Sequence, residues 1–507
     1  MLRIGMDTER RHYPFIAGRF WRSAGRFWRS AWLRRTVWLW PALATLLITT
    51  GQLGRAPLWR DELATWSAAT RPLGDLIRLA GTIDAVTAPY YLAMHGWIGV
   101  FGDSPPALRL PSALCMAGAA ALVTHLGARL LGVRAGLLAG LLFAVLPSTS
   151  RYGQEARPYA GVALLAVLAT VLLLRALAGQ TRRRWAGYAA ALVGLGLANL
   201  FAVSLVAGHA VAVLLHRRAT AGAAGLAGWL GAVAGAALVL APLAVLGRGQ
   251  QGRQLDWVDR PDLGDLVGLP GSVTQAMTVG GVLFGLAAVG LASSGRRGVA
   301  LGLTVLLPAA LLFIGGQLTP LWVPRYLLFV LPFAALLAAA ALAPLRLAAG
   351  LAIVLATGLL GGPEQVAIRR THETPRSAEV DYPAAVRVIA AHQQPGDGIV
   401  YSPRSGWAFL DLAVAYHLRG DRPRDVLLRQ DPITRADLWA SECAEPARCL
   451  APVDRVWLLI WGERSEPLDQ LPAARAEPLR TQFRLDRRWT VPGLTVALLT
   501  RHRAAAG

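Results

Sequence analysis

The stretch "PYAGVALLAVLATVLLLRALAGQTRRR", Pro158 to Arg184, joins an apolar run as long as a membrane span to a cluster of three arginines. The chain has 507 residues, of which 54% are hydrophobic and 16% charged, and similar apolar runs recur along most of it. A membrane-spanning helix needs about 20 mostly apolar residues. This pattern therefore indicates a polytopic α-helical membrane protein.

The charge of the chain is strongly basic, at +21, and every basic residue is an arginine because the sequence contains no lysine. The arginines form short clusters between apolar runs, which is typical of cytoplasmic loops under the positive-inside rule. We therefore expect no nucleic-acid partner. The guanidinium groups also suit bidentate binding of phosphate.

The first 35 residues carry nine arginines and a tandem repeat, "RFWRSAG" followed by "RFWRSAW", at residues 19–32. Basic and aromatic residues ahead of a span predict a cytoplasmic segment, residues 1–35, lying on anionic lipid headgroups. An unstructured tail is the alternative. The next apolar run, 36–53, reads as a retained signal anchor because it is too long for a signal-peptide core.

The arginine clusters also set the expected topology, with the N-terminus in the cytoplasm. About eleven spans place each cluster on the cytoplasmic side of a cell membrane. They are expected near 36–53, 110–131, 135–149, 157–178, 186–198, 199–216, 223–246, 270–293, 299–315, 326–343 and 347–361. The region 186–215 could instead form a single tilted helix. "PYYLAMHGWIGVF", residues 89–101, is too short to cross and predicts an interfacial helix within a first outer loop, 54–109.

After residue 361 the sequence becomes mixed and polar. "YPAAVRVIAAHQQPGDGIVYSP" predicts a helix, a turn and a strand, while "RVWLLIWG" and "LTVALLTR" predict buried strands. We therefore expect a soluble α/β domain over 363–507, on the outer face of the membrane. Cys443 and Cys449 lie close together in the sequence, and whether they are bridged stays open.

Carboxylates are scarce within the apolar part of the chain. Between Asp103 and Glu364 the only acids are Glu155 and four aspartates, at positions 256, 259, 262 and 265, and all five fall in expected outer loops. Proton-coupled transporters usually keep ionisable residues at mid-membrane depth. An outer-face enzyme is therefore favoured over a transporter or a flippase.

The outer rim gathers carboxylates, guanidiniums and aromatic rings. They come from "RDE" at residues 60–62, Asp84, "APYY" at 88–91, Arg109, "RYGQEARPYA" at 151–160, Trp257 and "PRY" at 324–326. Such a set supplies a base for proton abstraction, cations for a phosphate and rings for stacking on a sugar. A transferase that uses a lipid-linked sugar phosphate needs these groups.

This order of motifs resembles the GT-C superfamily of glycosyltransferases, and within it the family 39-like branch of protein O-mannosyltransferases and aminoarabinose transferases. The resemblance rests on "RDE", "APYYLAMHGWIGVFG", "ALRLPSAL", "RYGQEARPYA" and "PRYLLFVLP" and covers residues 36–345. It implies a GT-C catalytic domain over 36–361. It also implies inverting transfer of mannose or another hexose or pentose from a polyprenyl-phosphate donor. The acceptor would be a protein, a lipid or a glycan on the outer face.

The resemblance also assigns roles to residues. The first-loop acids of the family match Asp61 and Glu62, and neighbouring helical residues point about 100° apart. We therefore expect Asp61 to be the base and Glu62 to pair with an arginine or with the acceptor. Arg60, Arg157 and Arg325 are expected to bind the donor phosphate. The other expected substrate contacts are Asp84, Tyr90, Tyr91, Glu155, Tyr159, Trp257 and Tyr326.

Several of these residues could instead have simple structural roles. Glu155 and Arg157 could merely pair with each other, Asp84 could cap a helix, and Trp257 could be an interface anchor. Arg253 and Arg260 lie near the aspartates at 256–265 and predict a solvated, charge-balanced loop, so no metal is assigned there. No cofactor is expected, and the need for a divalent metal stays open. Two departures from the family, Ala88-Pro89 before the tyrosines and Asn199 in place of a histidine, leave the donor sugar and the acceptor open.

Overall fold

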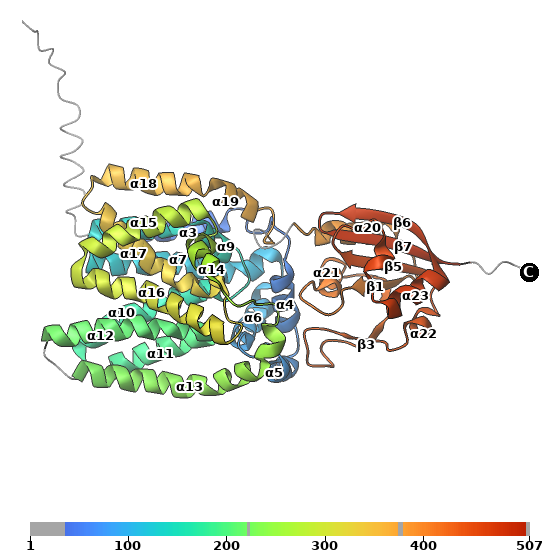
Figure 1. Cartoon of the computed structure of the whole chain (residues 1–507), viewed down its shortest axis with the longest axis horizontal. Helices are drawn as coiled ribbons and strands as arrows, with labels where there is room; N and C mark the ends of the chain where they lie inside the picture. Colours follow the sequence, from blue (N-terminus) through green and yellow to red (C-terminus); the bar gives the residue numbers. More distant parts are fainter. Residues whose placement is uncertain (1–35, 221–223, 374–378, 503–507) are drawn as a thin grey trace, which may run out of the picture.

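The computed structural model describes residues 36–220, 224–373 and 379–502. Figure 1 shows a bundle of long helices on one side and an α/β part on the other, with short helices of the first loop between them. The expected fold class, a helical membrane bundle followed by an α/β domain, is confirmed. The basic segment 1–35 lies outside the described residues.

The bundle follows the apolar runs of the sequence. Its helices are α3 (Leu39–Thr50), α7 (Pro105–Leu130), α8 (Val133–Val145), α9 (Pro147–Gly153), α10 (Tyr159–Gly179), α11 (Arg182–Ala198), α12 (Leu205–Thr220), α13 (Ala224–Gln254), α14 (Leu263–Thr274), α15 (Met277–Ser293), α16 (Gly295–Leu318), α17 (Leu331–Leu342), α18 (Leu347–Leu360) and α19 (Gly362–Ile368), with the 3-10 turns η1 (Leu200–Ser204) and η2 (Pro324–Val330).

Six helices of the described residues are long and apolar enough to cross a membrane, and the number rises to nine if each of three bent pairs is one span. Each expected span overlaps a helix of the structure. Helix α3, which overlaps the first expected span, is a shorter apolar helix of 12 residues. Large apolar side chains remain exposed on the bundle, among them Leu238, Val245 and Leu318, as expected for a surface that meets lipid.

The span expected at 135–149 is not straight. Helices α8 and α9 are bent by 64° at Leu146, whose extended backbone precedes Pro147. Proline disfavours a helical conformation in the residue before it, which accounts for the break. The pair α14 and α15 is bent by 98°, next to the left-handed Gln275.

The region 186–215 contains two helices. Helix α11 ends at Ala198, and the extended residue Asn199 together with η1 separates it from α12. The single-helix alternative is therefore excluded, and a break in the backbone lies at the rim of the bundle.

The first loop forms three helices, α4 (Arg60–Ala69), α5 (Leu73–Thr82) and α6 (Ala88–Phe101), which lie against the α/β part in Figure 1. Residue Tyr416 of the α/β part packs edge-on against Trp66, and Arg419 pairs with Asp103 at 2.9 Å. Apolar side chains of α4 and of the α/β part also share one buried cluster. The first loop is therefore packed between the bundle and the α/β part.

The α/β part contains a five-stranded sheet in the order β2-β1-β5-β7-β6. Strand β1 pairs in parallel with β2 and β5, whereas β7 pairs antiparallel with β5 and β6. The strands are β1 (Gly398–Ser402), β2 (Arg424–Asp425), β3 (Leu428–Gln430), β4 (Ser441–Glu442), β5 (Arg455–Trp461), β6 (Phe483–Val491) and β7 (Leu494–Arg501). The helices are α20 (Tyr382–His392), α21 (Leu410–His417), α22 (Pro446–Leu450), α23 (Ala473–Gln482) and the turn η3 (Pro467–Gln470).

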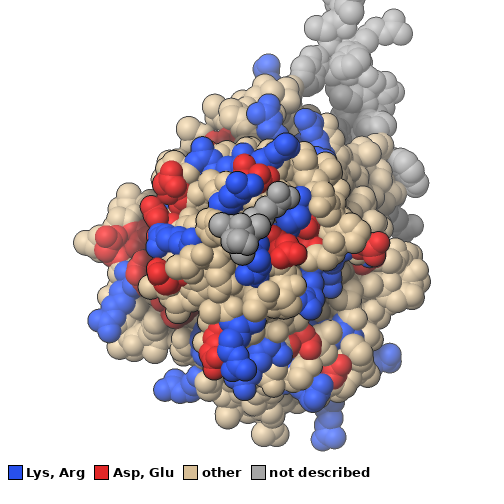
Figure 2. Space-filling view, turned by 90° about the vertical axis from the view of Figure 1, so that its right-hand side faces the viewer, with Lys and Arg blue, Asp and Glu red and all other residues tan. Residues whose placement is uncertain are grey.

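The predicted strands "RVWLLIWG" and "LTVALLTR" are β5 and β7, and the predicted helix, turn and strand are α20 and β1. Cys443 and Cys449 form a disulfide. Figure 2 shows acidic and basic side chains interspersed over this end of the molecule. Such a mixed charged surface is typical of a part that meets water.

Candidate active site

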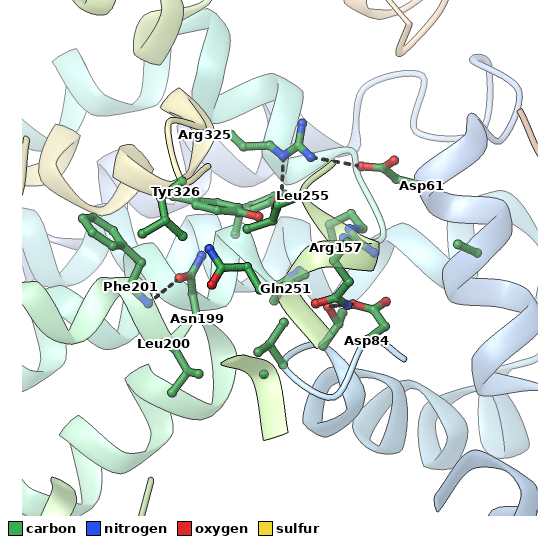
Figure 3. A pocket seen from close by; sticks show the side chains of 18 of the residues that line it. Asp61, Asp84, Arg157, Asn199, Leu200, Phe201, Gln251, Leu255, Arg325 and Tyr326 are labelled. Carbon is green, nitrogen blue, oxygen red and sulfur yellow. Dashed lines mark hydrogen bonds and ion pairs between the residues drawn. The ribbon is translucent and has the colours of Figure 1, made fainter. Parts of the chain in front are cut away.

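A cavity of about 780 Å³ lies where the first loop, the bundle and the α/β part meet. Nine of the twelve residues singled out from the sequence line it: Arg60, Asp61, Asp84, Tyr91, Arg157, Tyr159, Trp257, Arg325 and Tyr326. Residues far apart in the sequence are thus brought to one site, which Figure 3 shows from close by.

The start of α4 separates its two acids. Trp59 has an extended backbone, and its N–H donates to the carboxylate of Glu62, which caps the helix. Because neighbouring helical residues point about 100° apart, Asp61 can face the cavity while Glu62 points into the protein. Asp61 lines the cavity wall, and its Oδ2 lies 3.9 Å from the guanidinium of Arg325.

Glu62 is fully buried and does not line the cavity. Arg109 donates to both of its carboxylate oxygens, at 2.8 and 2.6 Å, and the N–H of Ala156 donates at 2.9 Å. Burial raises the pKa of Glu62, but Arg109 and His372 outweigh burial and hold that pKa well below its usual range. Glu62 is therefore a fixed anion that ties α4 to α7.

Arg325 enters the cavity from η2. Its Nε donates to the hydroxyl of Tyr159 at 2.8 Å, and its guanidinium lies 5.4 Å from the ring centre of Trp257. The aromatic rings and the hydroxyl hold the guanidinium in one orientation. The side chain of Arg325 is 13% exposed, so its charge is mostly removed from water.

Arg157 lies in the turn between α9 and α10. One of its terminal nitrogens donates to the hydroxyl of Tyr91 at 3.4 Å, while its Nε is buried and has no hydrogen-bond partner in the described part of the chain. A buried donor without an acceptor is costly unless a ligand satisfies it. Arg157 and Arg325 together can hold an anion in the cavity.

Asp84 is the second carboxylate on the cavity wall, and its backbone is left-handed, with φ 58°. The hydroxyl of Thr87 and the side-chain amide of Gln254 donate to its carboxylate, each at 2.7 Å, and the hydroxyl of Tyr91 also donates. Burial raises the pKa of Asp84, although Arg157 and the hydroxyls of Tyr91 and Thr87 oppose the rise. The contact with Thr87 places Asp84 ahead of α6 without making it the residue that caps the helix.

Arg60 connects the first loop to the α/β part. It pairs with Glu373 at 3.3 Å, and its guanidinium lies 5.8 Å from the ring centre of Trp461 at the end of β5. Arg60 is 23% exposed and lines the cavity. The segment after α19 and the α/β domain therefore help to position the cavity rim.

Two further expected contacts lie away from the cavity wall, namely Tyr90 and Glu155. Glu155 is buried and pairs with Arg151 at 3.0 Å. The simpler interpretation of the sequence had paired it with Arg157. Arg151 lies on α9 and Glu155 lies in the turn that follows it, so a spacing of four residues was the only local signal for this contact.

Sequence reasoning missed several residues of the site. His372 lies with its Nδ1 3.6 Å from Glu62, and its carbonyl accepts from Arg151 at 2.5 Å. Trp407 reaches the cavity from the α/β part, and Gln251 reaches it from α13. No motif marked these positions, because their contacts join segments that are distant in sequence.

The described residues contain no group of three or more His, Cys, Asp or Glu side chains that could hold a metal ion. Asp262 and Asp265, from the acidic loop before α14, accept hydrogen bonds from each other's backbone N–H groups. They form a helix cap, which is the ordinary role of an acid at this position.

Comparisons with known proteins point to one fold. Residues 88–245 match the family model "Dolichyl-phosphate-mannose-protein mannosyltransferase". None of the curated proteins compared with the chain matches it. Two solved structures of ArnT from Cupriavidus metallidurans are similar, one bound to undecaprenyl phosphate and one in the apo state.

The bound ArnT structure aligns with a TM-score of 0.58 and 15% identity, covering 93% of this chain and 99% of ArnT. The apo structure aligns with a TM-score of 0.59 and 14% identity, covering 91% of this chain and 97% of ArnT. At this identity the similarity establishes the fold. The chain is a membrane protein with the fold of the GT-C superfamily of glycosyltransferases.

Proposed function

We propose that the protein is an inverting glycosyltransferase that moves a sugar from a polyprenyl-phosphate donor to an acceptor at the outer face of the membrane. The observation that carries this proposal is the convergence of Arg157, Arg325 and Asp61 on one cavity of a GT-C fold. Two cations for a phosphate and one carboxylate for a hydroxyl are the groups that such a transfer requires.

Arg157 and Arg325 are proposed to hold the donor phosphate, with Arg60 at the rim as a third cation. The Nε of Arg157 is an unused buried donor, and Arg325 is already oriented by Tyr159 and Trp257. Negative charge builds up on the phosphate as the sugar departs. Preorganised guanidinium groups stabilise that charge without having to move during the reaction.

Asp61 is proposed to accept the proton of the acceptor hydroxyl. The acceptor oxygen forms a bond to the anomeric carbon on the side opposite the phosphate, the bond from that carbon to the phosphate oxygen breaks, and its electron pair leaves with the phosphate. Glu62, fixed by Arg109 and the Ala156 N–H, positions α4 so that Asp61 faces the cavity.

The lipid part of the donor is supported by two observations. The cavity wall includes apolar residues of the bundle, among them Leu200, Phe201 and Leu321. The structure of ArnT from Cupriavidus metallidurans, which shares this fold, is bound to undecaprenyl phosphate. We propose mannose or another hexose or pentose as the sugar and a protein, lipid or glycan as the acceptor.

The proposed orientation places the N-terminus in the cytoplasm and the α/β domain outside a cell membrane. Arg297 donates to the carbonyl of Leu130 at 2.6 Å, and Arg134 donates to that of Leu345 at 3.1 Å. Arginines from separate loops thus gather at the end of α7 that lies away from the first loop. This gathering supports a cytoplasmic assignment for that end.

The test is transfer of label from radiolabelled polyprenyl-phosphate mannose in membranes that carry the wild-type protein, Asp61→Asn or Arg296→Ala. Arg296 is exposed at the start of α16 and does not line the cavity, so Arg296→Ala is a control for loss of a charged side chain outside the cavity. We expect transfer that is lost only in Asp61→Asn, with glucose and arabinose donors tested in parallel. Transfer that survives Asp61→Asn, or no transfer from any of the three donors, would contradict the proposal.

A further inference from the structure

Two amide side chains, Asn199 and Gln251, lie on the bundle side of the cavity and have no role in the mechanism proposed above. Figure 3 shows the ends of these two side chains facing each other below Tyr326. Asn199 comes from the break between α11 and η1, and Gln251 from the last turn of α13. Amides carry both donors and acceptors, which suits them to neutral hydroxyl groups.

The orientation of the Asn199 amide is determined by a hydrogen bond from the backbone two residues further on. Its Oδ1 accepts the N–H of Phe201 at 2.9 Å and so caps η1. A backbone N–H is only a donor, so the oxygen must be the atom that meets it. The Nδ2 group of Asn199 is therefore left for the cavity, where it makes no hydrogen bond to described residues.

The Gln251 amide is an unused donor between two glutamines whose amides form hydrogen bonds. Gln250 accepts the N–H of Ala85 at 2.8 Å and donates to a carbonyl of α5, while Gln254 donates to Asp84 at 2.7 Å. By contrast, the Nε2 of Gln251 is buried and has no hydrogen-bond partner within the described ranges. Buried amide groups normally have partners, so this donor points to a ligand with an acceptor oxygen.

The charges of the cavity indicate which sugar it can accept. Its described lining contains four arginines, at positions 60, 157, 248 and 325, and two aspartates, at positions 61 and 84. Asp84 already receives three hydrogen bonds, and Asp61 lies beside Arg325. With four guanidinium groups against two carboxylates, the described lining disfavours a cationic amino group and favours an anionic lipid that carries an uncharged sugar.

We propose that Asn199 and Gln251 form a subsite that binds hydroxyl groups of the donor sugar and selects a neutral sugar over an amino sugar. This inference rests on the proposed function, because it assumes a sugar linked to a lipid phosphate. The two amides donate N–H groups to sugar hydroxyl oxygens while the arginines hold the phosphate.

The test uses the purified full-length protein in lipid nanodiscs with the variants Asn199→Asp and Gln251→Leu. Asn199→Asp retains the oxygen that caps η1 and removes only the Nδ2 donor, so a loss caused by it does not arise from a broken cap. Gln470→Ala, an exposed amide in η3 remote from the cavity wall, is the matched control. Thermal unfolding midpoints check that all variants fold.

Two constants are measured: the apparent KM for polyprenyl-phosphate mannose, or for whichever neutral-sugar donor is transferred, and the inhibition constant of polyprenyl phosphate without a sugar. We expect each cavity variant to raise the donor KM about fivefold to tenfold, as for loss of one hydrogen bond. The inhibition constant should change less than about twofold, since the arginines hold the phosphate. Equal increases in both constants would show that the amides contact the phosphate and would overturn the sugar subsite.

A second arm compares neutral-sugar and amino-sugar donors. We expect the wild-type protein to prefer the neutral sugar and Asn199→Asp to reduce that preference, because its carboxylate can pair with an ammonium group. A wild-type preference for the amino sugar would overturn the inference. If polyprenyl phosphate binds in an Arg157-dependent manner but the amide variants behave as wild type, only the sugar subsite is contradicted. If neither polyprenyl phosphate nor a sugar-carrying polyprenyl phosphate binds, the proposed function is contradicted too.

Discussion

The carboxylate of Asp61 lies 3.9 Å from the guanidinium of Arg325, although the two residues are separated by most of the bundle in sequence. This pair joins α4 of the first loop to η2, and both partners line the cavity. A donor phosphate that binds Arg325 would weaken its contact with Asp61. The carboxylate would then be available to a hydroxyl group.

Replacing Asp61 with Asn should abolish transfer while leaving the protein folded. The amide is nearly isosteric with the carboxylate but cannot accept a proton, and loss of a general base typically costs about 10²–10⁴-fold in rate. The measurement is the rate of sugar transfer, together with the thermal unfolding midpoint in nanodiscs. Near-wild-type activity of Asp61→Asn would show that another residue accepts the proton.

Arg325→Ala should weaken donor binding more than acceptor binding. Hydrogen bonds to a charged group contribute about 1.5–3 kcal/mol, which corresponds to a rise of roughly tenfold to a hundredfold in the donor KM. The variant Arg325→Lys retains the charge but not the planar fork that contacts Tyr159, so we expect it to be intermediate. Equal effects on the apparent constants of donor and acceptor would count against a phosphate role.

Removing the buried carboxylate of Glu62 should destabilise the protein. Arg109 would then be a buried cation without its main partner, which typically costs about 3–5 kcal/mol. We expect Glu62→Gln to lower the unfolding free energy by this amount. Adding Arg109→Leu to that variant should restore part of the loss. An unchanged unfolding curve for Glu62→Gln would show that Arg109 finds other acceptors.

The sequence was sufficient to locate the apolar helices and the strands, because each follows from the length or alternation of one local apolar run. It predicted about eleven spans, whereas the described residues contain six to nine. It also identified Asp61 and Glu62 as residues on different faces of α4, because helical phase is local. The sequence predicted that Glu62 pairs with an arginine or with the acceptor, but neither the identity of that arginine, Arg109, nor the contact between Arg60 and Glu373 could be predicted. Both contacts join segments whose approach is fixed by packing rather than by any periodicity.

The bends between helices are a further feature that the sequence did not predict in full. The span expected at 135–149 was predicted without a break, although it contains Pro147, and the angle of 64° between α8 and α9 depends on how these helices pack against their neighbours. Trp407 offers a second example, since it belongs to a polar segment with no motif. It reaches the cavity only because the α/β part folds back onto the first loop.

His372 should make stability depend on pH. Burial, together with the charges of Arg151 and Arg109, lowers the pKa of His372 to about 3 from 6.5, against the opposing effect of Glu62. The unfolded chain then binds more protons than the folded one below pH 6.5, so this contribution to stability is lost as the pH falls toward 3. Between pH 7 and pH 5 the loss amounts to about 2 kcal/mol.

The measurement is denaturant unfolding at pH 5, 6 and 7 for the wild type, His372→Gln and His502→Gln. His502 is exposed near the end of the described chain, so its replacement controls for loss of a histidine. We expect only His372→Gln to flatten the pH dependence. Parallel curves for the wild type and His372→Gln would mean that other groups carry that dependence.

Trp407 should affect the acceptor rather than the donor. It lines the cavity from the α/β part, opposite the bundle, and its ring packs against Trp439 at 5.1 Å and Phe409 at 6.0 Å between centres. This support holds the indole rigid, and an aromatic face is suited to contact with a sugar or an apolar group. We expect Trp407→Ala to raise the acceptor KM roughly tenfold with little change in the donor KM.

Trp407→Phe retains an aromatic ring on the same support and should recover most of the acceptor affinity. If Trp407→Ala and Trp407→Phe unfold at the same temperature, a merely structural role of Trp407 in the α/β part would not predict this recovery. The two apparent constants are measured by varying one substrate at a saturating level of the other. If Trp407→Ala instead raised the donor KM, the α/β domain would belong to the donor side of the cavity. The acceptor would then have to enter between the first loop and the bundle.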